Sequence, residues 1–310
     1  MRLRTHLWLN PVGIWHKLKF CRTFLLVSFA IGVITTLAQD RDDPKFSNQA
    51  ERTAKNLSRQ IRQEIRQLGK HEWAGDYYEG DGTGENVSFL IAPKHGYVFE
   101  WRGCLGSYDR NYGGVTVTNG RLQLSFTFTN KHKGFEGIAE EFVPVRWGKR
   151  AYLVPTKEIV GFCNEVNSGS EPRREPHGRY LLRRGDEKLP VTGYPAVPAE
   201  YQAWLLKRPI ETEIEKIGKA VTRPSKADFK FKDTTVTINS GTRQGLRQGM
   251  EFYVTDPRNL VQTADIVSVA DSESQGVITQ TGEDDPAPKV GWKLSTRAPW
   301  RNMDDSKPAK

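Results

Sequence analysis

Residues 115–126 carry the sequence VTVTNGRLQLSF, in which valine, leucine and phenylalanine alternate with polar residues on either side of Asn119-Gly120. Alternation with a period of two is typical of a β-strand that buries one face. An Asn-Gly pair between two such runs is the strongest short-range signal for a tight hairpin turn, because both residues tolerate a positive φ. The stretch therefore predicts a β-hairpin with one apolar face.

The same alternation extends outward from this hairpin in both directions. Before it, short alternating runs contain Val87, Phe89 and Ile91, then Tyr97, Phe99 and Trp101, and after it come Phe142, Val143, Val145, Trp147, Tyr152, Leu153, Val154 and a strand at 179–183. A sheet with one apolar face must curl or pack on a second layer to bury it. We therefore expect a mainly β (α+β) protein in which residues 70–195 form a meander sheet or half-barrel.

Three segments have a helical spacing of apolar residues. Residues 45–69 place Ala54, Leu57, Ile61, Ile65 and Leu68 on one stripe that stops at Gly69, which predicts an amphipathic helix within an N-terminal segment at 39–69. It could dock on the first domain, form a stalk or pair with a second copy. Residues 156–170 predict a short helix, and residues 196–226 predict a helical connector that Pro209 should interrupt.

A second domain is expected at residues 227–298, where five short strands are separated by glycine-marked turns. Residues 236–254, VTINSGTRQGLRQGMEFYV, combine apolar alternation with Gly241, Gly245 and Gly249. This pattern resembles the small β-barrel module in the C-terminal parts of flagellar assembly proteins and in rod-shape-determining periplasmic proteins. The resemblance implies a small β-barrel that is structural or mediates protein contacts, and it implies no catalytic residue.

A second resemblance concerns the first domain. Trp73-x-Gly75-x-Tyr77 and residues 103–113, GCLGSYDRNYG, resemble an uncharacterised family of exported bacterial proteins, and the opening of the domain also resembles lipocalin-like meanders. That family brings no established activity, so the resemblance implies export and nothing about chemistry.

Residues 24–38, FLLVSFAIGVITTLA, form the longest apolar run, and five basic residues but no acid precede it. A basic start, a short apolar core and a small-residue end are typical of an export signal. At 15 residues the run is short of the about 20 that a membrane-spanning helix needs. We therefore expect residues 1–38 to be a signal peptide cut after Ala38 or a signal anchor, and the protein to be periplasmic or extracellular.

The charge of the chain argues against a nucleic-acid partner. The net charge is +9, and removing the five basic residues of the leader leaves +4. A nucleic-acid binder should show a concentrated basic patch. We therefore expect no nucleic-acid partner, and membrane contact only through the N-terminal segment.

Three cysteines are present, of which Cys21 lies in the leader. In an oxidising compartment, Cys104 and Cys163 are expected to form a disulfide. The alternatives are that Cys104 is a nucleophile, which needs a nearby base, or that the two cysteines are separate buried thiols. His95, His132 and His177 sit in no recognisable catalytic context.

The densest cluster of polar and aromatic residues lies at 102–112. The ligand-binding candidates are Arg102, Tyr108, Asp109, Asn111 and Tyr112, together with Asn164 and Arg173, which the disulfide would draw near, and Arg146 on an adjacent predicted strand. Small-ligand pockets combine aromatic walls with a few polar groups, and arginine can hold a carboxylate by a two-point contact. The alternative is structural, with Asp and Asn making local turns and Tyr covering the sheet.

The sequence contains no recognisable catalytic set, metal-ligand spacing or cofactor motif. We therefore expect a non-enzymatic binding or envelope-assembly module whose partner is an envelope protein or a small ligand. The alternatives are an envelope hydrolase, or a small-ligand carrier, that uses the Cys104–Tyr112 region. The oligomeric state is left open, and residues 299–310 are expected to be a disordered tail.

Overall fold

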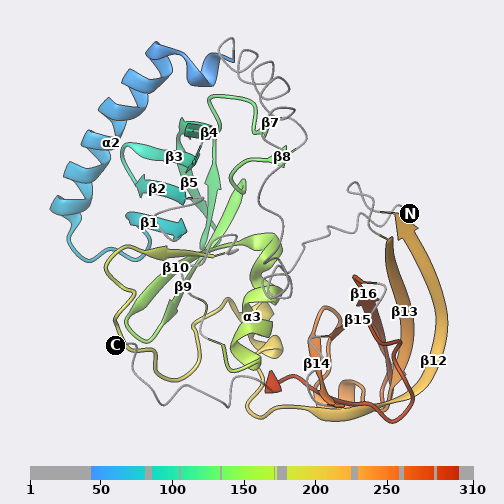
Figure 1. Cartoon of the computed structure of the whole chain (residues 1–310). Helices are drawn as coiled ribbons and strands as arrows, with labels where there is room; N and C mark the ends of the chain where they lie inside the picture. The colour runs from blue at the N-terminus through green and yellow to red at the C-terminus, as the bar shows by residue number, and fades with distance from the viewer. Residues whose placement is uncertain are drawn as a thin grey trace. The chain divides into compact units, whose positions relative to one another are not determined.

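The computed structural model describes residues 43–80, 86–104, 106–132, 135–170, 172, 180–224, 230–257, 262–282 and 285–299. The predicted leader and the predicted tail beyond Pro299 lie outside this range. The described residues from Pro44 onward belong to one compact unit (Figure 1). None of the described helices combines the length and the hydropathy that crossing a bilayer requires.

The predicted N-terminal helix is confirmed as α2, Asn48–Leu68, which follows a short 3₁₀ turn, η2, at Pro44–Phe46. The Ser47 side chain accepts a hydrogen bond from the Ala50 N–H and so caps the first turn, and Gly69 ends the helix with a positive φ. The apolar stripe of Ala54, Leu57, Ile61 and Ile65 packs against the first domain. The helix therefore docks on strands of that domain, chiefly β2 (Asn86–Ala92) and β3 (Gly96–Gly103).

Glu64 fastens the second half of α2 to the turn between β2 and β3. Its carboxylate accepts the backbone N–H groups of Lys94 at 2.8 Å and His95 at 3.1 Å, and lies 2.7 Å from His95 Nδ1. Burial acts to raise the pKa of Glu64, but the hydrogen bonds from Lys94 and His95 outweigh it and hold the pKa below its usual value. The ionised carboxylate is therefore the form that fastens the helix.

Replacing Glu64 with glutamine should lower the free energy of unfolding near pH 7 by about 1–2 kcal/mol, because hydrogen bonds to a charged acceptor are lost. A carboxylate whose folded pKa is lowered stabilises the fold above its unfolded pKa, and this stabilisation is lost as the pH falls through the folded pKa. The two proteins should therefore converge in stability below pH 4.5, the ordinary value for the group. Urea unfolding across this pH range measures the difference, and a constant gap would contradict the assignment.

The first domain is a nine-stranded antiparallel sheet in the order β4-β3-β2-β1-β11-β10-β9-β6-β5. Its strands are β1 Gly75–Gly80, β2 Asn86–Ala92, β3 Gly96–Gly103, β4 Gly106–Gly113, β5 Val115–Thr118, β6 Arg121–Leu124, β9 Glu141–Trp147, β10 Arg150–Pro155 and β11 Leu181–Arg183. A small separate ribbon joins β7, Lys131–His132, to β8, Phe135–Glu136. The predicted hairpin at Asn119-Gly120 is β5–β6, and both turn residues have a positive φ.

The sheet curls until its two ends nearly meet. Ser125 donates its N–H to the Gly114 carbonyl at 3.0 Å, and Thr127 donates to the Tyr112 carbonyl at 3.1 Å. The segment that follows β6 therefore lies against the end of β4, which confirms the predicted mainly β fold with a barrel-like first domain.

Large side chains fill this first domain. Phe89, Tyr97 and Phe142 are almost fully buried, and the centre of the Phe89 ring lies 5.7 Å from that of Tyr97 and 5.5 Å from that of Phe142.

The predicted short helix is α3, Ile159–Asn167, preceded by a 3₁₀ turn, η3, at Thr156–Glu158. Phe162 of α3 packs against Tyr152 of β10 in a second cluster. The two helices thus cover different parts of the sheet.

The second domain is a closed antiparallel barrel in the order β12-β13-β16-β15-β14-β17. Its strands are β12 Glu211–Pro224, β13 Lys230–Ile238, β14 Glu251–Asp256, β15 Thr263–Val269, β16 Ser274–Gln280 and β17 Lys293–Ser295, with a 3₁₀ turn, η5, at Thr242–Gln244. Ile238, Met250 and Phe252 are fully buried inside it. The predicted small β-barrel is confirmed, with one strand more than the five expected.

The extra strand corrects the predicted connector at 196–226. Within the described part of this segment the structure has a short 3₁₀ turn, η4 at Ala199–Trp204, and β12 begins at Glu211. Ile210, Ile214 and Ile217 have a spacing that a helix and a bulged strand both allow, and pairing with β13 settles it in favour of the strand. The second domain accordingly begins near Glu211 rather than at residue 227.

Candidate functional site

The structure places five of the predicted site residues on the hairpin formed by β3 and β4. Arg102 lies near the end of β3, and Tyr108, Asp109, Asn111 and Tyr112 lie on β4. The sequence interpretation missed this strand, because its polar residues suggested turns. Strand alternation turns Asp109 and Asn111 to the face opposite Arg110 and Tyr112.

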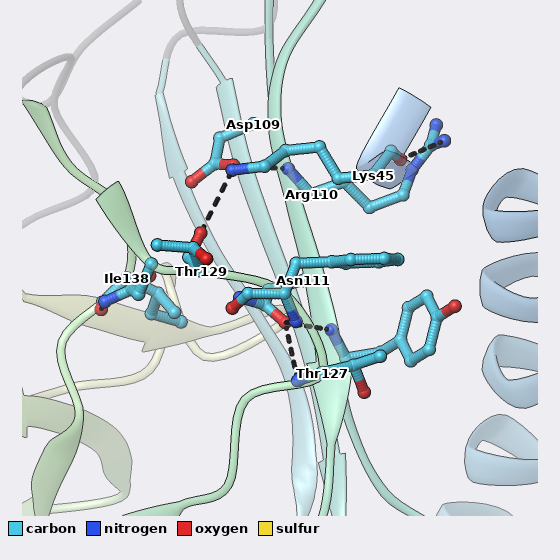
Figure 2. A network of polar contacts seen from close by, with 10 residues as sticks. Lys45, Asp109, Arg110, Asn111, Thr127, Thr129 and Ile138 are labelled. Carbon is cyan, nitrogen blue, oxygen red and sulfur yellow. Dashed lines mark hydrogen bonds and ion pairs between the residues drawn. The ribbon is translucent and has the colours of Figure 1, made fainter. Parts of the chain in front are cut away.

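Asp109 forms a buried ion pair with Lys45, which lies in η2 just before α2 (Figure 2). Lys45 Nζ is 2.9 Å from Asp109 Oδ1, and the two side chains are only 3% and 4% exposed. Lys45 also donates to the Thr129 carbonyl at 3.3 Å, while Asp109 Oδ1 accepts the Arg110 N–H at 2.9 Å. The ion pair therefore ties the segment before α2 to the edge strand of the sheet.

Arg110 makes a second connection, on the face that α2 covers. Its Nη2 lies 2.7 Å from Glu100 Oε1, and its Nη1 donates to the Lys45 carbonyl at 3.5 Å. The other oxygen of Glu100 lies 2.7 Å from Arg102 Nη2. Arg110 is buried whereas Arg102 is exposed, so Glu100 joins a structural guanidinium to one that faces solvent.

Asn111 holds the segment that follows β6. The side chain is fully buried, and its Nδ2 donates to the Phe128 carbonyl at 3.0 Å. Its Oδ1 accepts the N–H groups of Thr127 and Phe128, each at 3.2 Å (Figure 2). The Phe128 ring in turn packs edge-on against Tyr112, 5.3 Å away. A buried amide with this set of partners fixes a loop. Its role is structural, but it is not the local turn that the sequence suggested, because Asn111 lies in β4 and its partners are residues 127 and 128.

The aromatic residues near the hairpin have packing partners too. Tyr108 lies edge-on to Trp101 with ring centres 5.6 Å apart. Burial, followed by the negative charge of Asp109, raises the pKa of Tyr97 above its usual value. The Tyr97 phenol is therefore neutral at physiological pH and belongs to the core.

A shallow groove of about 380 Å³ lies between α2 and this hairpin. Its charged lining consists of Glu51, Lys55, Arg59, Glu100, Arg102 and Arg110. Lys55 pairs with Glu51 at 2.6 Å, and Glu100 pairs with both neighbouring arginines. Exposed arginines can bind a carboxylate or phosphate, but here carboxylates of the protein already occupy much of that role.

Arg102 is the one described site candidate that lines this groove, and the candidates outside β3 and β4 lie elsewhere. Arg146 is exposed on β9 and donates to the His71 carbonyl at 3.2 Å, and Asn164 on α3 donates to the Gly249 carbonyl at 2.8 Å. Arg173 lies outside the described residues. The predicted gathering of all eight residues therefore reduces to the β3–β4 group.

The prediction of a Cys104–Cys163 disulfide is wrong, because the structure has no bond between these two cysteines. Cys104 is exposed at the turn between β3 and β4, whereas Cys163 is buried on α3 beside β10. Four strand steps separate β3 from β10 in the sheet, about 19 Å at the usual strand spacing. The Cα atoms of a disulfide must lie within about 7 Å of each other. The sequence showed two thiols but not their positions.

We expect the two thiols to differ sharply in reactivity. Burial raises the pKa of the Cys163 thiol to about 12, so the reactive thiolate is scarce at neutral pH, and the side chain is shielded as well. Of these two residues, brief treatment of the folded protein with iodoacetamide should label Cys104 and spare Cys163. Labelling in denaturant should modify both, as mass spectrometry can measure. If both thiols reacted only after a reductant was added, the result would instead indicate that Cys104 and Cys163 form a disulfide.

Sequence reasoning missed the residues that complete the β4 network. Lys45 is a single basic residue 64 positions before its partner, and no local pattern marks such a contact. The Glu100–Arg110 pair could have been found from register, since the two residues face each other across β3 and β4. Cross-strand neighbours of opposite charge are a usable signal once the strands are assigned.

In the described part of the chain, no group of three or more His, Cys, Asp or Glu side chains is arranged to hold a metal ion. Comparisons with protein-family models, curated proteins and solved structures found no match for this chain.

Proposed function

We propose that the chain is exported from the cytosol and acts in the cell envelope as a non-enzymatic binding or assembly module. The export part rests on the leader-like sequence of residues 1–38. The binding part rests on the roles of Asp109 and Asn111, two buried polar residues of β4 that hold segments of the first domain in place.

The observation that carries the proposal is the engagement of Asp109 and Asn111. A group that performs acid–base chemistry must reach a substrate. Asp109 is 2% exposed and faces Lys45, and Asn111 is fully buried against residues 127–128. These contacts use the two residues to hold segments of the fold in place, which supports a scaffold that presents surfaces.

The packing of the first domain argues against the small-ligand carrier. A carrier of the lipocalin type needs a sizeable cavity within its sheet. Here Phe89, Tyr97 and Phe142 pack against one another inside the domain, with Leu122 and Leu153 in the same cluster. The hydrolase alternative keeps one supporting observation, the exposure of Cys104.

The export part is tested by fractionating cells that produce the full chain and by determining the N-terminus of the purified protein by mass spectrometry. We expect the protein outside the cytosol, either beginning near Gln39 or with residues 24–38 retained in the membrane. Recovery from the cytosol with the leader intact would refute export.

The binding part is tested by cross-linking in intact cells, followed by purification from envelope extract. We expect a discrete envelope protein to be captured at a defined ratio. A chain that captures none, and whose Cys104→Ala variant loses a measurable hydrolytic activity, would favour the hydrolase alternative.

A further inference from the structure

Much of one edge of β12 has no strand paired with it in the described structure. This strand pairs with β17 only at Glu211–Glu213, and Ile214 bonds to Gly291 and Trp292. From Glu215 to Pro224, β13 is the only strand in the described ranges that pairs with β12. Figure 1 shows β12 as the long gold strand on the outside of the second barrel. Alternate N–H and C=O groups of such an edge point away from β13.

Features of the β12 sequence limit nonspecific pairing with other strands but leave part of the edge able to pair. Two bulges interrupt its register with β13, one between Ile214 and Lys216 and one between Ile217 and Ala220. Bulges and lysines at an edge are devices that keep sheets from aggregating. From Ala220 to Pro224, however, the register is unbroken. Val221, which is 49% exposed, lies within that regular stretch.

The charge around the edge selects the partner. Lys216, Lys219, Lys230 and Lys232 are all exposed on the β12–β13 hairpin. Two described acids lie within residues 215–233 of this hairpin. One of them, Asp233, is held by Arg223 and by the Thr279 hydroxyl. Glu215 lies 3.8 Å from Lys216 and offsets only that lysine. Two copies of the same basic edge repel each other, whereas an acidic strand is attracted.

We propose that the edge of β12 binds an extended acidic peptide segment of an envelope protein, which adds to the barrel as a further strand next to Ala220–Pro224. This inference deepens the proposed function and rests on it for the location of the partner. Backbone hydrogen bonds supply affinity in such strand addition, and the lysines supply the preference for acidic side chains. The partner's chemistry is therefore an unpaired strand in which acidic residues alternate with apolar ones.

The test uses the full chain and a blocked peptide of alternating glutamate and valine, about as long as the open edge. Two further peptides separate the sources of binding. In one, lysine replaces glutamate, and in the other, alternate backbone amides are N-methylated so that the charge is kept but strand pairing is blocked. Binding is measured by fluorescence anisotropy, and hydrogen exchange of the backbone amides locates it.

We expect the acidic peptide to bind and to slow hydrogen exchange between Lys219 and Arg223, and the lysine and N-methylated peptides to do neither. The variant Lys216→Glu with Lys219→Glu should bind the acidic peptide about tenfold more weakly, because attraction becomes repulsion. The matched variant Lys157→Glu with Lys188→Glu makes the same change of charge at exposed sites of the first domain and should bind as the parent chain does.

Three results would overturn the proposal. Equal binding of the N-methylated peptide would mean that charge alone attracts the ligand. Absence of binding by the acidic peptide would remove the partner class. Protection of β12 that appears without peptide and grows with protein concentration would assign the edge to a second copy of the chain. None of these results depends on export, so failure of the inference can be told from failure of the proposed function.

Discussion

Replacing Asp109 with alanine is expected to lower the free energy of unfolding by about 3–5 kcal/mol, because the change leaves the Lys45 ammonium buried without its carboxylate. The pair is 2.9 Å apart, and both side chains are almost completely shielded from water. Removing one member of a buried pair costs far more than the pair itself contributes, since a buried charge has lost its hydration. Urea unfolding of the parent and variant chains measures the loss.

Two further variants keep this prediction testable if Asp109→Ala fails to fold. Replacing both partners, with Lys45→Met and Asp109→Leu, removes the buried charges together and should recover most of the lost stability. Lys55→Ala breaks an exposed pair with Glu51 and should cost no more than about 0.5 kcal/mol. Equal effects of Asp109→Ala and Lys55→Ala would show that the Lys45–Asp109 pair is not buried in solution.

The local elements were predictable because each has a signal within a few residues. The β5–β6 hairpin follows from Asn119-Gly120 between two alternating runs, and α2 follows from an apolar stripe that stops at Gly69. Glycine-marked turns at Gly245 and Gly249 likewise indicated the small barrel, and both have a positive φ. In these places local propensity and the final packing agree.

The missed features all depend on residues far apart in the sequence. β4 is a strand although its residues favour turns. It pairs with β3, and Asn111 forms hydrogen bonds with backbone groups of the segment after β6. β12 has a spacing that a helix also allows, and its pairing with β13 decides the matter. Lys45 and Asp109 meet only because α2 docks on the sheet. No periodicity within one segment carries that information.

The closure of the first domain leads to the second large effect. Gly113 ends β4 where the chain after β6 crosses it, and a Cβ at this position would overlap the Ser125 carbonyl oxygen. The carbonyl oxygen belongs to the backbone, and the position of a Cβ is fixed by the backbone, so neither can turn away as the end of a long side chain would. Gly113→Ala should therefore force the seam apart and destabilise the fold by at least about 3 kcal/mol, beyond the usual cost of overpacking a core.

Gly114 provides the matched control, since it is the next residue and has nothing within 4 Å of an added Cβ. Gly114→Ala should change stability by no more than roughly 0.5 kcal/mol, because no strained conformation or clash opposes it. Hydrogen exchange distinguishes a local from a general effect. In Gly113→Ala the amides of Thr127 and Phe128, which bond to Asn111, should lose protection before those of β1 and β2. If the two alanine variants were equally stable, the sheet would have to be open at this seam, and the polar network around Asn111 would be held by something other than its closure.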